Sequence, residues 1–188
     1  MTSSRNDDAI LDAAKQCVLA VGMRRTTLAE IARRAGVSRP TVYRRWPDVR
    51  TLSADLLTRE LVALLPADTG DGSRRHGIDG IVRTVSAARQ HPLFVKILET
   101  DPELLSTYVF DRLGASQQRI LEVLTTAIRS GQADRTIRSG DPDELAAMVL
   151  LLVQSAVLSA RIVSDALPPD RLDAQLRTVL DTYLRPEE

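Results

Sequence analysis

Apolar positions near the start of the chain recur with the spacing of an amphipathic helix. Over residues 10–21 they follow a period of about 3.6 residues, and Gly22 then supplies a stop signal. A second helical pattern starts after Thr27, which can act as its N-cap, has Glu30 at capping-box spacing and stops at Gly36. The pattern therefore predicts two helices joined by a short segment.

A third, short helix follows after a turn of about two residues. Ser38 can cap it, and Pro40 is tolerated in its first turn because the backbone donor that proline lacks is unpaired there. Pro47 then closes the helix. So short a turn makes the second and third helices cross steeply, which is helix-turn-helix spacing. Val42 and Trp46 lie four residues apart and are predicted to face the first two helices.

The remaining pattern is also helical, and no alternation of apolar and polar residues argues for a strand. Prolines and polar runs separate further helices at about 51–65, 75–90, 92–100, 102–130, 142–165 and 169–184. The predicted fold is therefore all-α. The run PADTGDGS marks a boundary, so the prediction divides the chain into residues 1–52, a connecting helix and linker at 53–72, and a larger helical domain at 73–188.

The segment from Leu145 to Val163 is apolar over nineteen residues and is long enough to raise the question of a membrane span. Gln154, Ser155 and Arg161 argue against that interpretation. A helix that is apolar on nearly every side packs on two fronts. We expect one front to face the chain's own core and the other a second copy, although packing in the core alone also fits the pattern.

Charge is distributed unevenly along a chain whose formal net charge is zero. Residues 1–53 hold ten Lys and Arg against five Asp and Glu, whereas the remainder holds fifteen against twenty. Such polarity predicts that the N-terminal part meets an anionic partner, although a solvated basic face would give the same count. Arg39 and Tyr43 share one face of the third helix, with Thr41, Arg44 and Arg45 nearby, and arginines on a helix of this width can read guanine in the DNA major groove.

The usual signs of an enzyme are missing from the sequence. It has two histidines, His76 and His91, and neither a glycine-rich phosphate loop nor a nucleophile elbow. Asp101 and Glu103 are close acids in a proline-marked turn, where helix N-termini favour acids without catalysis. We therefore expect no enzyme, no metal and no cofactor.

The single cysteine, Cys17, lies on the apolar stripe of the first predicted helix and is interpreted as a buried thiol. One cysteine excludes an internal disulfide framework, which fits a reducing compartment. The N-terminal residues MTSSRNDDAI do not resemble a signal peptide. The expected location is the cytoplasm.

Residues Ile10 to Leu52 resemble the DNA-binding domain of the TetR family of transcriptional regulators. The residues that carry the resemblance are Ala13-Ala14, Gly22, Thr26-Thr27, Ile31-Ala32, Ala35-Gly36-Val37-Ser38, Thr41, Tyr43 and Leu52. Three positions depart from the family pattern. Val18 and Trp46 stand where phenylalanine is common, and Val49 stands where a phosphate-binding lysine is frequent.

The resemblance implies a set of DNA-binding residues, and Ser38 belongs to it. Thr27 and Tyr43 would bind phosphates, and Arg50 would take over the phosphate contact that Val49 cannot make. Bases would be reached by three residues that follow Ser38 at the start of the third helix: Arg39, Pro40 and Thr41. Arg44 and Arg45 fit either role.

The C-terminal part resembles the TetR-like domain in which small ligands bind and two chains pair. A candidate ligand pocket falls among six apolar residues, Phe94, Leu98, Tyr108, Phe110, Met148 and Leu152. Residues at helical spacing also fit an ordinary core. The resemblance implies a homodimeric repressor that a small-molecule effector releases from a palindromic operator. The alternative is a helical DNA-binding or partner-binding protein without such an effector.

Overall fold

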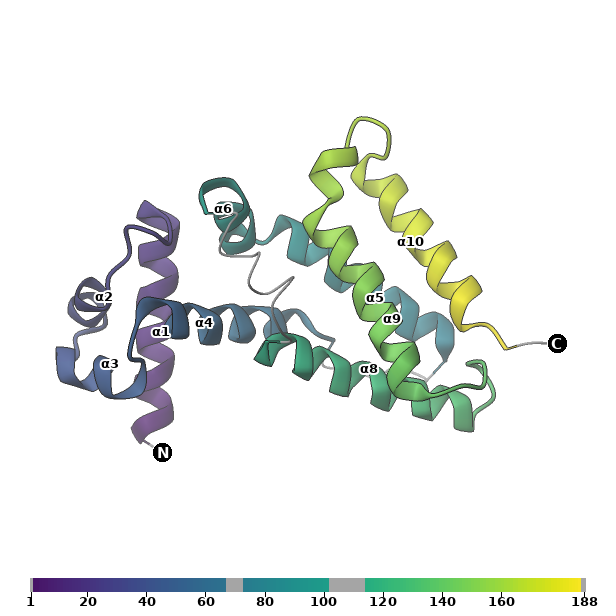
Figure 1. Cartoon of the computed structure of the whole chain (residues 1–188), viewed down its shortest axis with the longest axis horizontal. Helices are drawn as coiled ribbons and strands as arrows, with labels where there is room; N and C mark the ends of the chain where they lie inside the picture. The colour runs from purple at the N-terminus through teal and green to yellow at the C-terminus, as the bar shows by residue number, and fades with distance from the viewer. Residues whose placement is uncertain (1, 67–72, 102–113, 187–188) are drawn as a thin grey trace. The chain divides into compact units, whose positions relative to one another are not determined.

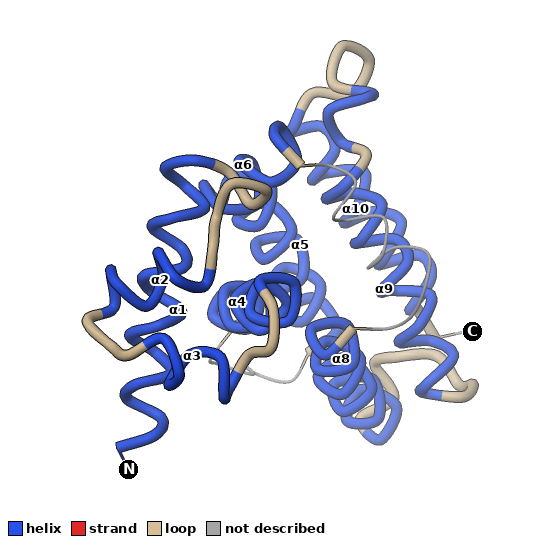
Figure 2. The backbone as a smooth tube through the Cα atoms, turned by 60° about the vertical axis from the view of Figure 1, so that its left-hand side comes forward, coloured by secondary structure: helices blue, strands red, loops and turns tan. Residues whose placement is uncertain are grey.

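The computed structural model describes residues 2–66, 73–101 and 114–186. Every regular element within these residues is a helix, which confirms the predicted all-α fold (Figures 1 and 2). The described residues group into two compact units. One contains residues 2–61, 91–101 and 114–116, and the other contains 62–66, 73–90 and 117–186. The predicted domain limits at residues 52 and 72 stay a prediction.

The first unit begins with the three helices that the pattern predicts. They are α1 (Thr2–Val21), α2 (Leu28–Ala35) and α3 (Arg39–Arg45), and α2 and α3 lie on one side of α1 (Figure 1). Glycines end the first two helices, because Gly22 and Gly36 have φ angles of 82° and 68°, a region that glycine enters without a steric penalty.

The predicted N-caps of α2 and α3 are present in the structure. Thr27 accepts a hydrogen bond from the backbone N–H of Glu30 at 3.2 Å, and Ser38 accepts one from the N–H of Thr41 at 3.3 Å. The second half of the capping box is replaced by another contact. The Glu30 carboxylate turns to Arg33, with which it makes hydrogen bonds of 2.6 and 2.8 Å.

Apolar burial holds these three helices together. Fully burying a large aliphatic side chain contributes about 1.5–3 kcal/mol to folding. The apolar side chains at most 1% exposed in this unit lie on or directly after α1, α2, α3, α4 (Val49–Leu64) and α6 (Pro92–Thr100). They are Ile10, Ala14, Val18, Ile31, Ala32, Val42, Trp46, Leu52, Leu56, Leu93 and Ile97. Val42 and Trp46 thus face inward as predicted.

Two further helices complete the first unit. Helix α4 (Val49–Leu64) starts in this unit, and α6 (Pro92–Thr100) matches its predicted limits and contacts α1. Asp101, expected to be an acid at a helix N-terminus, is instead the C-cap of α6 and is 2% exposed.

The second unit packs four helices around its own core. They are α5 (Arg74–Gln90), α8 (Ala115–Ala133), α9 (Pro142–Leu158) and α10 (Pro169–Leu184). Helices α5, α9 and α10 contact one another, and α9 and α10 run side by side (Figure 1). Their buried residues include Ile78, Val82, Val149, Leu150, Leu176 and Leu180.

Two predicted helices differ from the structure. The single helix expected at 102–130 is wrong, because Gly114 is not helical and α8 starts only at Ala115. Glycine is about 1 kcal/mol less favourable than alanine in a helix interior. The helix expected to reach residue 165 ends at Leu158 and continues as the 3₁₀ turn η2 (Ala160–Val163). Ile162 there is 84% exposed, so little packing supports further helical turns.

The membrane interpretation of the segment from Leu145 to Val163 finds no support. Among the helices that the structure describes, none is long and apolar enough to cross a bilayer.

Candidate nucleic-acid interface

Helix α3 is held by contacts at both ends. At its N-terminus the hydroxyls of Ser38 and Thr41 lie 2.7 Å apart and share a hydrogen bond. At its C-terminus Trp46 donates from Nε1 to Asp55 Oδ2 at 2.8 Å. Between these anchors Val42 is fully buried. One side of α3 is therefore fixed to the core, and its other side faces solvent.

The presented side carries the residues predicted to meet DNA. Arg39, Pro40 and Arg44 are exposed, Tyr43 is 50% exposed, and Thr41 is half-buried. A large exposed aromatic residue among arginines has no packing role in the core. Such a surface can offer both hydrogen-bond donors and an apolar face to a duplex.

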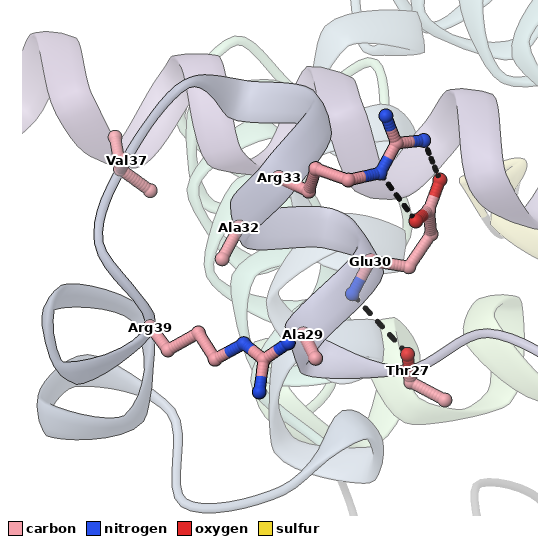
Figure 3. Close-up of a pocket in the computed structure, with 7 residues that line it drawn as sticks. All are labelled: Thr27, Ala29, Glu30, Ala32, Arg33, Val37 and Arg39. Atoms are coloured by element: carbon pink, nitrogen blue, oxygen red, sulfur yellow. Dashed lines mark hydrogen bonds and ion pairs between the residues drawn. The ribbon is translucent and has the colours of Figure 1, made fainter.

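An open groove of about 390 Å³ separates α2 from α3. Figure 3 shows Arg39 reaching from α3 toward Ala29 of α2. Seven residues line the groove: Thr27, Ala29, Glu30, Ala32, Arg33, Val37 and Arg39. A hydrogen bond from Arg33 lowers the pKa of Glu30, so the only acid of this lining stays ionised and is paired with Arg33. The groove thus keeps the positive charge of Arg39.

Arg45 occupies a different environment from the other arginines of α3. Its Nε lies 3.2 Å from Asp7 Oδ2 on α1, and its guanidinium lies over the Trp46 ring, 5.3 Å from the ring centroid. The Arg45 side chain is still 57% exposed. These contacts give it a structural role that the sequence did not indicate.

Arg50, the predicted phosphate contact, lies in the first turn of α4, and a side-chain cap holds the start of that helix. Asp48 Oδ1 accepts a 2.7 Å hydrogen bond from the N–H of Thr51, and this bond lowers the pKa of Asp48. Arg50 is exposed in the first turn, whereas Val49 is half-buried. The position after Val49 is therefore the one that presents a cation.

Sequence analysis missed several residues of this surface. Ala29 and Arg33 line the groove, and Asp7 and Asp55 both anchor the C-terminal end of α3. The spacing of Glu30 and Arg33, one helical turn apart, was a usable signal for their ion pair. No local signal marks Asp7, which lies 38 residues before its partner.

Four residues of the predicted ligand pocket lie within the described residues, two in each unit. Phe94 is buried on α6 with its ring centroid 5.0 Å from that of His91, and Leu98 is half-buried. On α9, Met148 is 40% exposed and Leu152 packs against the core of the second unit. Tyr108 and Phe110 lie outside the described residues. The pocket stays a prediction. In the described part of the chain no three His, Cys, Asp or Glu side chains gather as metal ligands would.

Residues 2–61 therefore contain a helix-turn-helix (HTH) unit of the DNA-binding class. Comparison with known proteins agrees with that class, since residues 10–52 match the model of the bacterial regulatory proteins of the tetR family. The HTH-type transcriptional regulator Rv2250c of Mycobacterium tuberculosis is 43% identical over 190 residues, which cover 98% of this chain and 100% of the relative. The chain belongs to the TetR family of transcriptional regulators, whose members are regulators and not enzymes.

Solved structures share the fold. The crystal structure of a TetR-family regulator from Rhodococcus sp. has a TM-score of 0.70 at 25% identity and covers 98% of this chain and 100% of its own. The flavonoid-responsive regulator FrrA has a TM-score of 0.62 at 22% identity, with 98% and 100% covered. The second likeness concerns the fold alone.

Proposed function

We propose that this chain is a sequence-specific repressor that binds a palindromic operator as a homodimer and is released by a small-molecule effector. The observation that carries the proposal is the exposed face of α3, where Arg39, Tyr43 and Arg44 project from a helix whose opposite face is buried. A helix held in this way can enter the major groove and hold its side chains against base edges.

Each residue of the interface has a proposed role. Arg39, Pro40 and Thr41 lie in the first turn of α3 and contact bases, with Ser38 fixing that turn through Thr41. Thr27, Tyr43 and Arg50 contact DNA phosphates on either side of the major groove that α3 enters. Arg44 extends the base or phosphate contacts. Arg45 keeps its pair with Asp7 and so holds the end of α3 against α1.

The proposed dimer forms through α9 and α10. Large apolar side chains remain exposed on these helices in the single chain: Met148 at 40%, Leu151 at 61% and Val179 at 45%. A cluster of this kind favours burial against a second copy. Two HTH units related by a twofold axis would meet half-sites about one helical turn apart on the duplex.

The proposed effector acts by favouring a chain conformation that binds DNA less tightly. A typical coupling free energy of about 1–3 kcal/mol would change the DNA affinity by roughly 5- to 150-fold. FrrA is described as flavonoid-responsive, and regulation by a small organic molecule is proposed here by analogy of fold. A DNA-binding protein without an effector is the second candidate, and a ligand-dependent change of DNA affinity separates the two. We place the protein in the cytoplasm, where its DNA is.

The test is fluorescence anisotropy of the purified chain on DNA that flanks its own gene, compared with random DNA at two salt concentrations. Tight binding with a clear preference for the flanking DNA would support a sequence-specific regulator. The salt slope counts phosphate contacts at about 0.9 per contact. Absence of binding at low salt on both DNAs would overturn the proposed function.

A further inference from the structure

Asp101 is a buried carboxylate outside the predicted DNA-contact residues. It caps the C-terminus of α6, its backbone N–H donates to Ile97 O at 2.9 Å, and its side chain is 2% exposed. A carboxylate removed from water costs free energy unless donors surround it. The partners of Asp101 therefore indicate what the residue is for.

Two of those partners, Met23 and Arg24, come from the turn between α1 and α2, and the third, Thr100, is the last residue of α6. Asp101 Oδ2 accepts hydrogen bonds from the backbone N–H of Met23 at 2.9 Å and from Thr100 Oγ1 at 2.7 Å, and Arg24 Nε lies 3.6 Å from Oδ1. Burial alone would raise the pKa of Asp101. The hydrogen bonds and the charge of Arg24 outweigh burial and lower this pKa, so the carboxylate stays ionised.

The same turn approaches the end of α6 closely at Gly22. A Cβ atom built there would lie 3.3 Å from both Asp101 Oδ2 and Thr100 Oγ1, and the glycine has a φ of 82°. The buried Thr26 hydroxyl donates to Gly22 O at 2.8 Å and closes the turn. The next residue, Thr27, caps α2 and lines the groove between α2 and α3. The turn thus connects the Asp101 contact directly to the DNA-facing groove.

We propose that Asp101 is a positioning residue for DNA binding, which holds the backbone of Met23 and thereby sets where α2 begins and how the groove faces the duplex. The inference rests on the proposed DNA-binding function. A turn that is already ordered has no ordering cost on association, whereas a loosened turn has one. Asp101 therefore acts on DNA affinity without touching DNA.

The experiment compares three full-length variants with the wild-type chain on one duplex, selected by the wild-type chain from a random-sequence pool. Asp101→Asn keeps the shape of the side chain but removes its charge and replaces one acceptor oxygen by a donor. Thr100→Val removes a hydroxyl donor that Asp101 shares with Lys96 O, at an exposed position, and keeps the side-chain volume. Ile10→Val is the matched control, because it loosens the core of the first unit far from this turn.

DNA affinity is measured by anisotropy, thermal midpoints by calorimetry, and exchange of the Met23 amide hydrogen by NMR. We expect Asp101→Asn to weaken DNA binding about tenfold or more and to speed Met23 exchange, with Thr100→Val following in the same direction by a smaller factor. Ile10→Val should lower the thermal midpoint, while its DNA affinity and its Met23 exchange rate stay near those of the wild-type chain.

Two results would overturn the proposal. One is wild-type affinity in a folded Asp101→Asn chain. The other is that Asp101→Asn and Ile10→Val, at equal thermal midpoints, lose the same amount of DNA affinity while Met23 exchange in Asp101→Asn stays unchanged. If Asp101→Asn does not fold, Thr100→Val decides by the same two readouts. Failure of the wild-type chain to select any duplex would instead contradict the proposed DNA-binding function itself.

Discussion

The indole of Trp46 donates a 2.8 Å hydrogen bond from Nε1 to Asp55 Oδ2, which ties the end of α3 to the second turn of α4. Trp46 is 1% exposed and Asp55 is half-buried. The one tryptophan of the chain therefore does two things where a phenylalanine could do one. It fills the core, and it fixes the direction in which α3 ends.

Trp46→Phe tests that second role. Phenylalanine keeps most of the apolar ring but leaves Asp55 without this donor, so we expect the free energy of unfolding to fall by about 1–3 kcal/mol. Urea unfolding followed by circular dichroism measures the change. Tyr43→Phe is the control, because it removes an exposed hydroxyl and should change the stability by less than about 0.5 kcal/mol.

Arg39→Ala should relax the sequence preference of the protein at one base position. A bidentate contact between arginine and guanine discriminates against other bases by about 1–3 kcal/mol, and alanine cannot make it. Competition anisotropy with single-base variants of the selected duplex measures the preference, and Arg129→Ala on α8 is the control. A uniform loss over all duplexes would assign Arg39 to a phosphate instead.

Tyr43→Phe should weaken binding to every duplex by a similar factor, since a phosphate contact carries no sequence information. The same competition series measures it. A change of preference between duplexes would contradict the proposed phosphate role.

Leu151→Arg should disrupt the proposed dimer. Leu151 is 61% exposed on α9 in the single chain, and a charge there would have to be desolvated if the helix packs against a second copy. Sedimentation velocity measures the oligomeric state. Val123→Arg on α8, where the residue is 38% exposed, should leave the state unchanged. Equal behaviour of the two variants would argue against α9 as the interface.

Stability should decrease with falling pH because of His91. Burial and the charge of Lys15 lower the pKa of His91, although Glu60, 3.3 Å from Nε2, opposes the shift. An unfolded histidine titrates near about 6.5, so below that pH the unfolded chain binds more protons and folding loses free energy. Between about pH 7.5 and 5.5 the contribution of His91 to the pH dependence of the free energy of unfolding should vanish in His91→Gln and persist in His76→Gln. Urea unfolding at each pH measures it.

Cys17 should not react with a soluble thiol reagent while the chain is folded. The side chain is 2% exposed, and burial raises the pKa of the thiol, so the reactive thiolate is scarce at neutral pH. The absorbance of the thiolate released from an aromatic disulfide reagent, followed with and without denaturant, measures the reactivity. Rapid reaction in the folded chain would contradict the burial of α1 against its neighbours.

Local chemistry made much of the first unit predictable from sequence. The caps at Thr27 and Ser38 depend on residues three positions away, and the burial of Val42 and Trp46 follows from their spacing of four residues along one helix. The structure contains all of these features. The pair of Asp7 with Arg45 and the contact of Asp101 with Met23 join residues 38 and 78 positions apart. No periodicity encodes such pairs, because they exist only once the helices have packed.

The end of α9 shows a different limit. Apolar residues continue past Leu158, so the pattern predicts more helix, but Ile162 and Val163 are 84% and 43% exposed in the described chain. Hydrophobicity alone does not tell whether a segment packs on its own chain, and a helix without packing is marginal.

Both ends of α6 are fastened to the HTH unit. At the N-terminal end Glu60 accepts a hydrogen bond from Lys15 of α1 at 2.6 Å, and its Oε2 lies 3.3 Å from His91 Nε2. At the other end Asp101 accepts a hydrogen bond from the N–H of Met23. The first unit is therefore assembled from two stretches of sequence that are about thirty residues apart. A chimera that joined the first sixty residues of this chain to the remainder of a relative would separate Glu60 from His91 and Met23 from Asp101 in a single crossover. Exchange of operator specificity between family members, in the laboratory or in evolution, would then require both stretches to move together.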